Sequence, residues 1–313
     1  MAPTTVEIPV PRFDLDLVVR SHGWYDLPPF SWNGGEGRLR FVFLEGEDPF
    51  EAHVSAGRDA VVVRVKAAGS PPGTIEDKAV RPESRRSPVS RSRLVSVVSR
   101  VLDLTADLSA FHAVCRDRAA DGFAWIAERG AGRILRAPTL FEDAVKVLAT
   151  TNCTWGLTKV MVANLIAAFG RGGAFPPPSF VAGLRERELV ALKVGYRAPY
   201  LAAFAERVAS GTLDLARWED ASRPDAEVEK EIRSEKGFGP YAADTLGRLL
   251  GRHAKLGLDS WSRKKVAEIR FRGRAGKDAR VERFYRPFGP HAGLAFWLDV
   301  TRDWHDGRER LWP

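Results

Sequence analysis

Short runs in which hydrophobic and polar residues alternate, or β-branched residues follow one another, fill the first part of the chain. Three of them read FDLDLVV, GRLRFVFL and DAVVVRVKAA, and they lie within residues 13–68. Segments rich in proline and glycine, LPPFSWNGGEG and GSPPG, separate them. A period of two residues between such breaks is typical of strands joined by short connections. The pattern therefore predicts an antiparallel sheet.

From about Leu94 onward the hydrophobic period lengthens to that of α-helices. The clearest segments read RLVSVVSRVLDL, LSAFHAVCRDRAADGFAWIAERG, TLFEDAVKVLATTN and LTKVMVANLIAAFG,. A polar stretch, PESRRSPVSRSR at residues 82–93, marks the change of pattern. We therefore predict an α+β chain, in which an N-terminal antiparallel sheet domain (residues 1–90) packs on an all-helical domain (residues 91–313).

The composition narrows the classes of function. The 313 residues carry a formal net charge of +8, which favours a polyanionic partner such as nucleic acid,. No run of eighteen apolar residues occurs, and the N-terminus lacks the basic start and apolar core of a signal peptide, so we expect no membrane partner,. Two cysteines, Cys115 and Cys153, are too few for a disulfide framework or a four-thiolate cluster,. These features favour a cytoplasmic, nucleoid-associated protein.

Two predicted helices follow each other closely near the C-terminal end. DAEVEKEIRSE and PYAADTLGRLLGRH are separated only by KGFG, so residues 225–251 are expected to form a tight helical hairpin. Gly237 and Gly239 permit positive φ angles and let another backbone come close,. Amides at the start of the second helix could then hold a phosphate. An ordinary helix–helix turn with a glycine cap is the alternative reading.

A lone aspartate follows this hairpin. KLGLD leads the chain back to Asp259, which directly precedes the predicted helix SWSRKKVAEI. Asp259 suits the N-cap of that helix, a frequent structural role. A carboxylate at this helix entrance, close to a phosphate-binding turn, could also lie opposite a deoxyribose. Both roles remain open from the residues alone.

Several segments, in order along the chain, resemble one superfamily. GFGPYAAD…LGLD looks like the helix-hairpin-helix, Gly/Pro-rich loop and aspartate (HhH-GPD) signature of the DNA glycosylases that include endonuclease III. KVLATTNCTWGLTKVMVANLIAAFG, VGYRAPYL and FGPHAGLAFW resemble segments of the 8-oxoguanine glycosylases within it. FDLDLVV resembles the first strand of the N-terminal sheet in that branch. The similarity extends from residue 13 to about residue 300.

The resemblance implies a reaction. Cleaving an N-glycosidic bond builds positive charge on the sugar, and a fixed carboxylate stabilises that charge. The resemblance gives this catalytic role to Asp259. Members that also cut the strand carry a nucleophilic lysine where this chain has Tyr241, and Lys236 precedes the hairpin, where it would face DNA phosphate,. The chain is therefore predicted to hydrolyse the bond without cutting DNA, with Tyr241 lining the base pocket as in alkylated-base glycosylases.

The same resemblance implies how the base and the gap in the DNA are held. Phe296, Trp297 and Trp24 would bind the extruded base, and an aromatic cage suits a cationic alkylated purine,. At the gap the matching residues are Asn152, Tyr196 and Arg197. A second arginine that reads an opposite cytosine in that branch is replaced by Leu157. Alkylated purines are thus the first expectation for the substrate and 8-oxoguanine the second.

Three readings of function stay open at this point. The first is a monomeric, monofunctional glycosylase acting on damaged double-stranded DNA in base excision repair. It would need no metal or cofactor, except for a structural monovalent cation that the resemblance allows on the hairpin carbonyls. The second reading is a bifunctional 8-oxoguanine glycosylase/lyase with a relocated lysine. The third is a relative that binds DNA lesions without catalysis, which the departure at Glu235 and Lys236 from the usual Leu-Pro favours.

Overall fold

The N-terminal part of the computed structural model is an antiparallel sheet, as predicted. The structure describes residues 4–69, 88–274 and 276–307. Within them the sheet has the strand order β1-β5-β4-β3-β2. The strands are β1 (Thr4–Pro9), β2 (Ser31–Asn33), β3 (Arg38–Glu45), β4 (Asp48–Gly57) and β5 (Ala60–Ala67). All four pairs of adjacent strands in this order are antiparallel.

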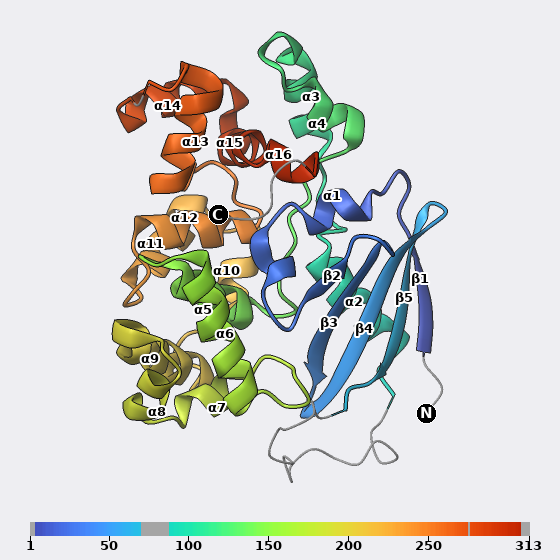
Figure 1. Ribbon diagram of the computed structural model, residues 1–313, viewed down its shortest axis with the longest axis vertical. Coiled ribbons are helices and arrows are strands. Elements are labelled where there is room, and N and C mark those ends of the chain that lie inside the picture. Colours follow the sequence, from blue (N-terminus) through green and yellow to red (C-terminus); the bar gives the residue numbers. More distant parts are fainter. Residues whose placement is uncertain (1–3, 70–87, 275, 308–313) are drawn as a thin grey trace.

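One face of the sheet is apolar and buried. The register places Leu39 opposite Val54, and Val54 opposite Val63. These three side chains are fully buried, because alternate residues of paired strands point to the same side,. Helix α2 (Arg91–Val101) lies behind the sheet in Figure 1 and contacts β1. Most buried hydrophobic residues of the sheet and of the helices form one continuous core, and Val42, Ala68 and Ala174 form a small second cluster.

The segment FDLDLVV was expected to be a strand, and this prediction was wrong. It forms helix α1 (Leu15–Val19), and the first strand lies before it, at β1. Asp14 is the N-cap of α1 and accepts a hydrogen bond of 3.1 Å from the Leu17 amide. The alternation of Asp and Leu suggested a period of two. A helical turn fits better, because Asp14 caps it and the consecutive residues 17–19 are all buried,.

The remainder of the described chain is helical, as predicted. Its α-helices are α3 (Ser109–Asp117), α4 (Ala124–Arg129), α5 (Leu140–Thr150), α6 (Trp155–Phe169), α7 (Pro178–Ala182), α8 (Glu186–Ala191), α9 (Ala198–Ala209), α10 (Ala216–Glu219), α11 (Asp225–Ser234), α12 (Pro240–Leu249), α13 (Ser260–Phe271), α14 (Asp278–Tyr285), α15 (Ala292–Val300) and α16 (Arg302–His305). The predicted segment 108–130 is divided between α3 and α4, because Gly122 adopts a positive φ between them.

Most of the helices after α2 lie to the left of the sheet and above it in the view of Figure 1. Helices α5 to α12 lie together, and α3 and α4 lie beside the C-terminal helices at the other end of the molecule (Figure 1). Trp125 of α4 contacts His305 of α16, with 5.6 Å between their ring centroids. The turn η1 (Gly23–Asp26) lies between these groups and the sheet. Residues from the two ends of the sequence therefore meet near the centre of the molecule.

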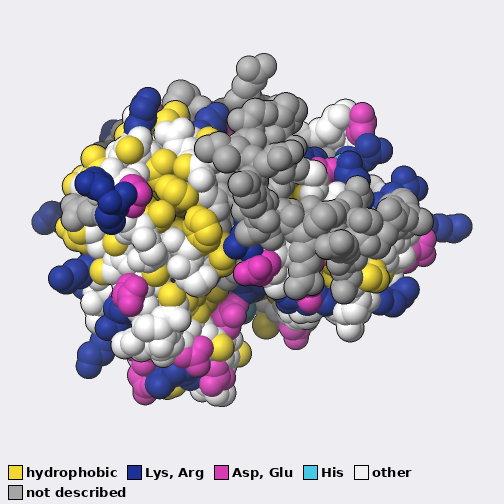
Figure 2. All heavy atoms as spheres, turned by 90° about the horizontal axis from the view of Figure 1, so that it is seen from below, with side chains coloured by type: hydrophobic (Ala, Val, Ile, Leu, Met, Phe, Trp, Pro, Cys, Tyr) yellow, Lys and Arg dark blue, Asp and Glu magenta, His cyan; other side chains and the backbone are white. Residues whose placement is uncertain are grey.

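The surface seen from below carries hydrophobic side chains over the helices, with basic side chains distributed around its edge (Figure 2). Phe180 of α7 and Val190 of α8 are among the exposed hydrophobic residues. Of the helices in the described ranges, none is long and apolar enough to cross a membrane. Residues 82–87 of the predicted boundary lie outside the described residues, so the division at residue 90 stays a prediction.

Candidate active site

Helix α12 supplies three side chains to one pocket. Tyr241, Thr245 and Arg248 lie on the same face of this helix, at intervals of four and three residues,. The helix begins at Pro240, a favourable first position because a proline has no amide hydrogen to leave unpaired,. We call the cavity that these residues border the Asp259 pocket.

The turn before α12 has the predicted hairpin form. Gly237 adopts a φ of +92°, and a Cβ atom there would lie 2.7 Å from Cδ1 of Leu148. Gly239, in contrast, has a φ of −71° and open space around it. Between them Phe238 is buried and anchors the turn in the core. Only at Gly237 does the turn therefore require a residue that tolerates a positive φ. Gly239 is exposed and leaves the N-terminus of α12 open.

Asp259 is the N-cap of α13, as the sequence indicated. Its Oδ1 accepts a hydrogen bond of 2.7 Å from the Ser262 amide, and the Ser262 hydroxyl lies 2.9 Å from the Asp259 amide. The two residues form a reciprocal capping box, which fixes the carboxylate at one rotamer,. The half-buried Asp259 also borders the pocket. Asp259 therefore caps α13, as the sequence suggested, and also lies at the wall of a pocket.

The Asp259 pocket has a volume of about 280 Å³. This is just below the usual range for small-molecule sites, about 300–1,000 Å³. Its walls come from η1, the segment after α5, α12, the start of α13, and the two C-terminal helices. The residues that border it are His22, Gly23, Trp24, Thr150, Cys153, Thr154, Trp155, Thr158, Tyr241, Thr245, Arg248, Gly257, Asp259, Ser260, Trp261, Ser262, Trp297 and Trp304.

Two titratable residues of the pocket are held neutral. Burial, together with the charges of Arg248 and Lys146, lowers the pKa of His22 to about 3,. Burial and the neighbouring charge of Asp259 raise the pKa of the Tyr241 phenol. At neutral pH the pocket therefore contains an uncharged imidazole and an uncharged phenol beside the aspartate.

Of the aromatic residues expected to bind the base, Trp24 and Trp297 border the pocket and Phe296 does not. Trp24 donates a 2.8 Å hydrogen bond to Asp143, and Trp297 donates one of 2.7 Å to the Ser21 carbonyl, so both rings are fixed. Phe296 is fully buried and packs edge-on against Tyr285, with 5.3 Å between ring centroids. The expectation for Phe296 needs correction, because successive residues of a helix point about 100° apart.

The three residues expected at the DNA gap lie together, but they are not equally accessible. Tyr196 is 53% exposed, and its hydroxyl accepts a 3.3 Å hydrogen bond from the Asn152 amide. Arg197 is only 4% exposed and donates hydrogen bonds to the Thr151 carbonyl and hydroxyl. The structure therefore places Arg197 as a support for the loop that presents Asn152, rather than as a residue that contacts a base.

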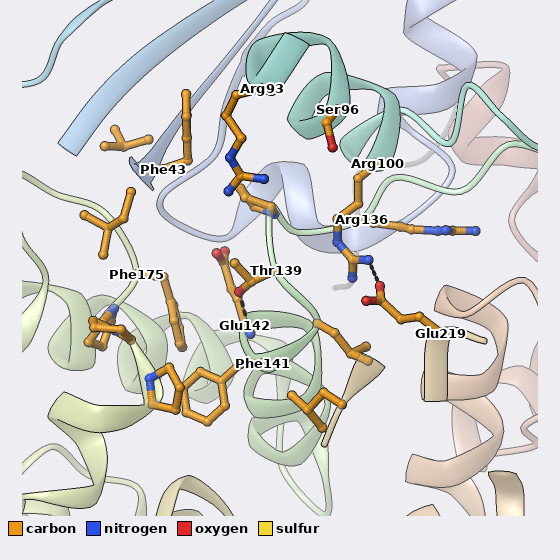
Figure 3. Close-up of a pocket in the computed structure, with 18 of the residues that line it drawn as sticks. Phe43, Arg93, Ser96, Arg100, Arg136, Thr139, Phe141, Glu142, Phe175 and Glu219 are labelled. Carbon is orange, nitrogen blue, oxygen red and sulfur yellow. Dashed lines mark hydrogen bonds and ion pairs between the residues drawn. The ribbon is translucent and has the colours of Figure 1, made fainter. Parts of the chain in front are cut away.

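A larger cavity, of about 930 Å³, lies between the sheet and the helices (Figure 3). The arginines that border it are each engaged by a carboxylate. These pairs are Arg93–Glu45, Arg100–Asp143, Arg100–Glu219 and Arg136–Asp103. Figure 3 shows Arg100 directed at Glu219. This cavity is a junction of paired charges and proline residues, and it lacks the cap-fixed carboxylate and aromatic walls of the Asp259 pocket.

No family model and no curated protein matches this sequence. Solved structures do match over nearly the whole chain. One is the 8-oxoguanine glycosylase/lyase of Clostridium acetobutylicum in complex with double-stranded DNA, with a TM-score of 0.68 and 17% identity over 98% of this chain and 97% of that one. Another is the 3-methyladenine DNA-glycosylase of Archaeoglobus fulgidus, with a TM-score of 0.72 and 13% identity over 96% and 98%. The chain has the helix-hairpin-helix DNA glycosylase fold.

Within this glycosylase fold, sequence reasoning missed Arg248, Trp155 and Trp261 as pocket residues. Arg248 had a usable signal, since it lies seven residues after Tyr241 and so two helical turns along the same face,. Trp261 follows Asp259 by two residues in the first turn of α13. Trp155 had none, because its ring reaches the pocket through the close approach that Gly23 allows. No group of three His, Cys, Asp or Glu residues in the described ranges could hold a metal ion.

Proposed function

We propose that this chain is a monofunctional DNA glycosylase, which hydrolyses the N-glycosidic bond of a damaged purine, alkylated or oxidised, in duplex DNA. One observation carries the proposal: Asp259 is fixed by a capping box at the wall of an aromatic pocket, next to a glycine hairpin. The fold supports it, since the similar structures are an 8-oxoguanine glycosylase/lyase and a 3-methyladenine DNA-glycosylase. Damaged double-stranded DNA is then the partner, in base excision repair.

The chemistry needs a carboxylate that does not move. As the base departs, positive charge develops on the sugar, and a preorganised negative group stabilises it. One oxygen of Asp259 is held by the Ser262 amide at 2.7 Å, while the other makes no hydrogen bond within the described part of the chain. That second oxygen is available to the sugar or to the attacking water.

The hairpin provides the grip on DNA. Gly239 and Pro240 are exposed at the start of α12, and a helix N-terminus attracts a phosphate through its free N–H groups and its dipole,. Lys236 is exposed beside the turn and adds a positive charge. Asn152 and Tyr196, which follow α5 and precede α9, are exposed and would enter the gap left by the extruded base,. A monomer, and a monovalent cation on the hairpin carbonyls, remain predictions.

The lining of the pocket favours hydrolysis over strand cleavage. A lyase step needs an amine that can attack the sugar. None of the described residues that border the Asp259 pocket is a lysine. By the resemblance, Tyr241 stands where the strand-cutting glycosylases carry their nucleophilic lysine. Lys146, which lies near Trp24, is buried and paired with Glu142 at 2.6 Å. A relocated lysine therefore has no candidate in the pocket.

The proposal is tested by base release from labelled duplexes that carry hypoxanthine, 3-methyladenine, 7-methylguanine or 8-oxoguanine. Each duplex is incubated with the wild type or with Asp259→Asn, and half of each sample is then treated with hot alkali. Asparagine is as good an N-cap as aspartate, so this variant should keep its fold. We expect alkali-dependent cleavage of at least one duplex, reduced about 10²–10⁴-fold in the variant.

The other outcomes separate the rival functions. Strand cleavage without alkali, with an adduct trapped by borohydride, would support a bifunctional enzyme. Tight binding to the lesion duplexes without release of any base would support a lesion-binding protein. Release that is equal in the wild type and Asp259→Asn would contradict the role assigned to the carboxylate.

A further inference from the structure

A buried arginine forms part of the wall of the Asp259 pocket. Arg248 is 2% exposed, and it borders the cavity together with Tyr241 and Thr245 of the same helix. One of its terminal nitrogens donates a 2.8 Å hydrogen bond to the Leu256 carbonyl. Its Nε has no hydrogen-bond partner in the part of the chain that the structure describes. The guanidinium group therefore keeps donor capacity that the protein does not use.

The charge of Arg248 is also without a close partner. In the described ranges it makes no ion pair, and the favourable charges of Asp244 and Asp259 act on it only through space. Burial is costly for such a group, and it lowers the pKa of Arg248 to about 10,. The side chain is still charged at neutral pH. An unpaired buried cation in a pocket favours a ligand that brings electron-rich acceptor atoms.

The position of Arg248 changes the expected role of Trp297. The guanidinium carbon lies 4.5 Å from the centre of a Trp297 ring, so one face of this ring already holds a cation,. A cationic base stacked there would compete with Arg248 for the same electron-rich face. It would also meet the like charge of Arg248 at short range. His22, being neutral, leaves Arg248 as the one cationic side chain among the described residues that border the pocket.

We propose that Arg248 is a specificity-determining residue, which selects uncharged purines bearing carbonyl oxygens, such as hypoxanthine or 8-oxoguanine, over purines with a fixed positive charge. The inference rests on the proposed glycosylase function and names the substrate class of its pocket. An arginine pairs well with the acceptor edge of such a base, since its fork of N–H donors matches adjacent acceptors. A 3-methyladenine or 7-methylguanine base would meet repulsion at the same position.

The test compares single-turnover release of hypoxanthine, 8-oxoguanine, 7-methylguanine and 3-methyladenine by the wild type, Arg248→Met and Arg248→Lys. Methionine keeps the length of the side chain without its charge, whereas lysine keeps the charge without the fork. Arg64→Met removes the same charge from an exposed position on β5 and is the matched control. We expect the wild type to release an uncharged base fastest, and Arg248→Met to lose about tenfold to a hundredfold on that base. Arg248→Lys should retain the discrimination against charged bases.

The results distinguish this inference from the function on which it rests. Fastest release of 7-methylguanine or 3-methyladenine by the wild type, abolished in Asp259→Asn, would leave the glycosylase function standing and overturn the role of Arg248. Unchanged release of the uncharged bases by Arg248→Met would overturn it too. If Arg248→Met does not fold, the role of Arg248 is still tested by the order in which the wild type releases the four bases and by the release measured for Arg248→Lys. No release of any base would overturn both proposals.

Discussion

Asp259 and Tyr241 lie on the wall of one pocket, so a change at Tyr241 should alter the chemistry available beside the carboxylate. The substitution Tyr241→Lys would place an amine where the phenol now stands, close to the negative charge of Asp259. Burial would lower the pKa of this amine, against the opposing charge of Asp259, and would leave more of it in the nucleophilic neutral form,. We therefore expect the variant to form an adduct with abasic DNA that borohydride traps. The wild type should form none.

The control for this variant is Tyr241→Met, which fills a similar space without an amine. The readout is the fraction of labelled DNA that migrates with the protein in a denaturing gel after reduction. Equal trapping by the wild type and Tyr241→Lys would mean that another amine of the chain reaches the sugar, and it would favour the bifunctional reading.

At this scale the sequence predicted four residues that border the pocket and misplaced two others. Asp259, Tyr241, Trp297 and Trp24 border one cavity, although they come from four separate segments. Their co-location was available through the resemblance and not through any local pattern. Phe296 failed because a match at one position of a helix does not tell which way the side chain points. Arg197 is buried against Thr151, and an arginine in a sequence is ordinarily expected on the surface,.

At the scale of elements, the hairpin between α11 and α12 gives a matched pair of substitutions. Gly237→Ala would force a left-handed φ of +92° on alanine and bring its Cβ to 2.7 Å from Leu148. We expect the free energy of unfolding to fall by about 1–3 kcal/mol. Gly239→Ala meets no atom within 4 Å and has an ordinary φ of −71°, so its stability should change by less than about 0.5 kcal/mol,.

The same pair also tests the grip on DNA. If the hairpin receives a phosphate at Gly239, a methyl group there obstructs the approach of the backbone without disturbing the fold. Gly239→Ala should then bind a duplex with an abasic-site analogue more weakly than the wild type, while urea unfolding of the two proteins coincides. Unchanged affinity in a correctly folded Gly239→Ala would argue against contact between this turn and DNA.

The elements themselves were predictable where a single signal dominated. The long helices α5, α6 and α12 follow a helical period with clear ends, and β3 and β5 follow runs of β-rich residues. Strands β1 and β4 were missed, because their sequences mix glutamate, proline and glycine with fewer apolar residues and are ordered by pairing with β5,. The short strand β2 was missed too, because it lies within the proline- and glycine-rich segment LPPFSWNGGEG. Helix α1 was mistaken for a strand because Asp14 and Asp16 alternate with leucines, as polar residues do along a half-buried strand.

At the scale of the whole molecule, Asp143 joins the segment around η1 to the helices. Its carboxylate accepts hydrogen bonds of 2.8 Å from both Trp24 Nε1 and the Ala137 amide, and one of 2.9 Å from Arg100. All three partners are donors, so an alanine at position 143 would leave them unpaired in the interior. We expect Asp143→Ala to lower the free energy of unfolding by roughly 3–5 kcal/mol.

This substitution should also affect the pocket, because Trp24 is held there by Asp143. Base release by Asp143→Ala should be slower than that of the wild type even at temperatures at which the variant is folded. The matched control is Asp278→Ala, which breaks the exposed ion pair with Arg263 and should change stability far less,. Similar urea midpoints for the two variants would contradict the importance given to the Asp143 cluster.

The contact between the C-terminal helix and α4 adds a dependence on pH. His305 is 4% exposed, and neither of its ring nitrogens has a hydrogen-bond partner in the described ranges. Burial, with the charges of Arg129 and Arg20, lowers the pKa of His305 from 6.5 to about 3. Below pH 6.5 the unfolded chain therefore binds a proton at this residue that the folded chain does not, and the folded state loses stability as the pH falls.

A variant that cannot take up this proton should lose less stability in acid. His305→Phe keeps a ring beside Trp125, so its packing should resemble that of the wild type. Between pH 7 and pH 5 the wild type should lose about 2 kcal/mol more of its free energy of unfolding than the variant, because each pH unit below 6.5 contributes about 1.4 kcal/mol per histidine. Urea unfolding at pH 7, 6 and 5 measures both curves. Parallel curves would mean that His305 becomes protonated in the folded protein, and that the junction of α4 with α16 opens to water more readily than its burial indicates.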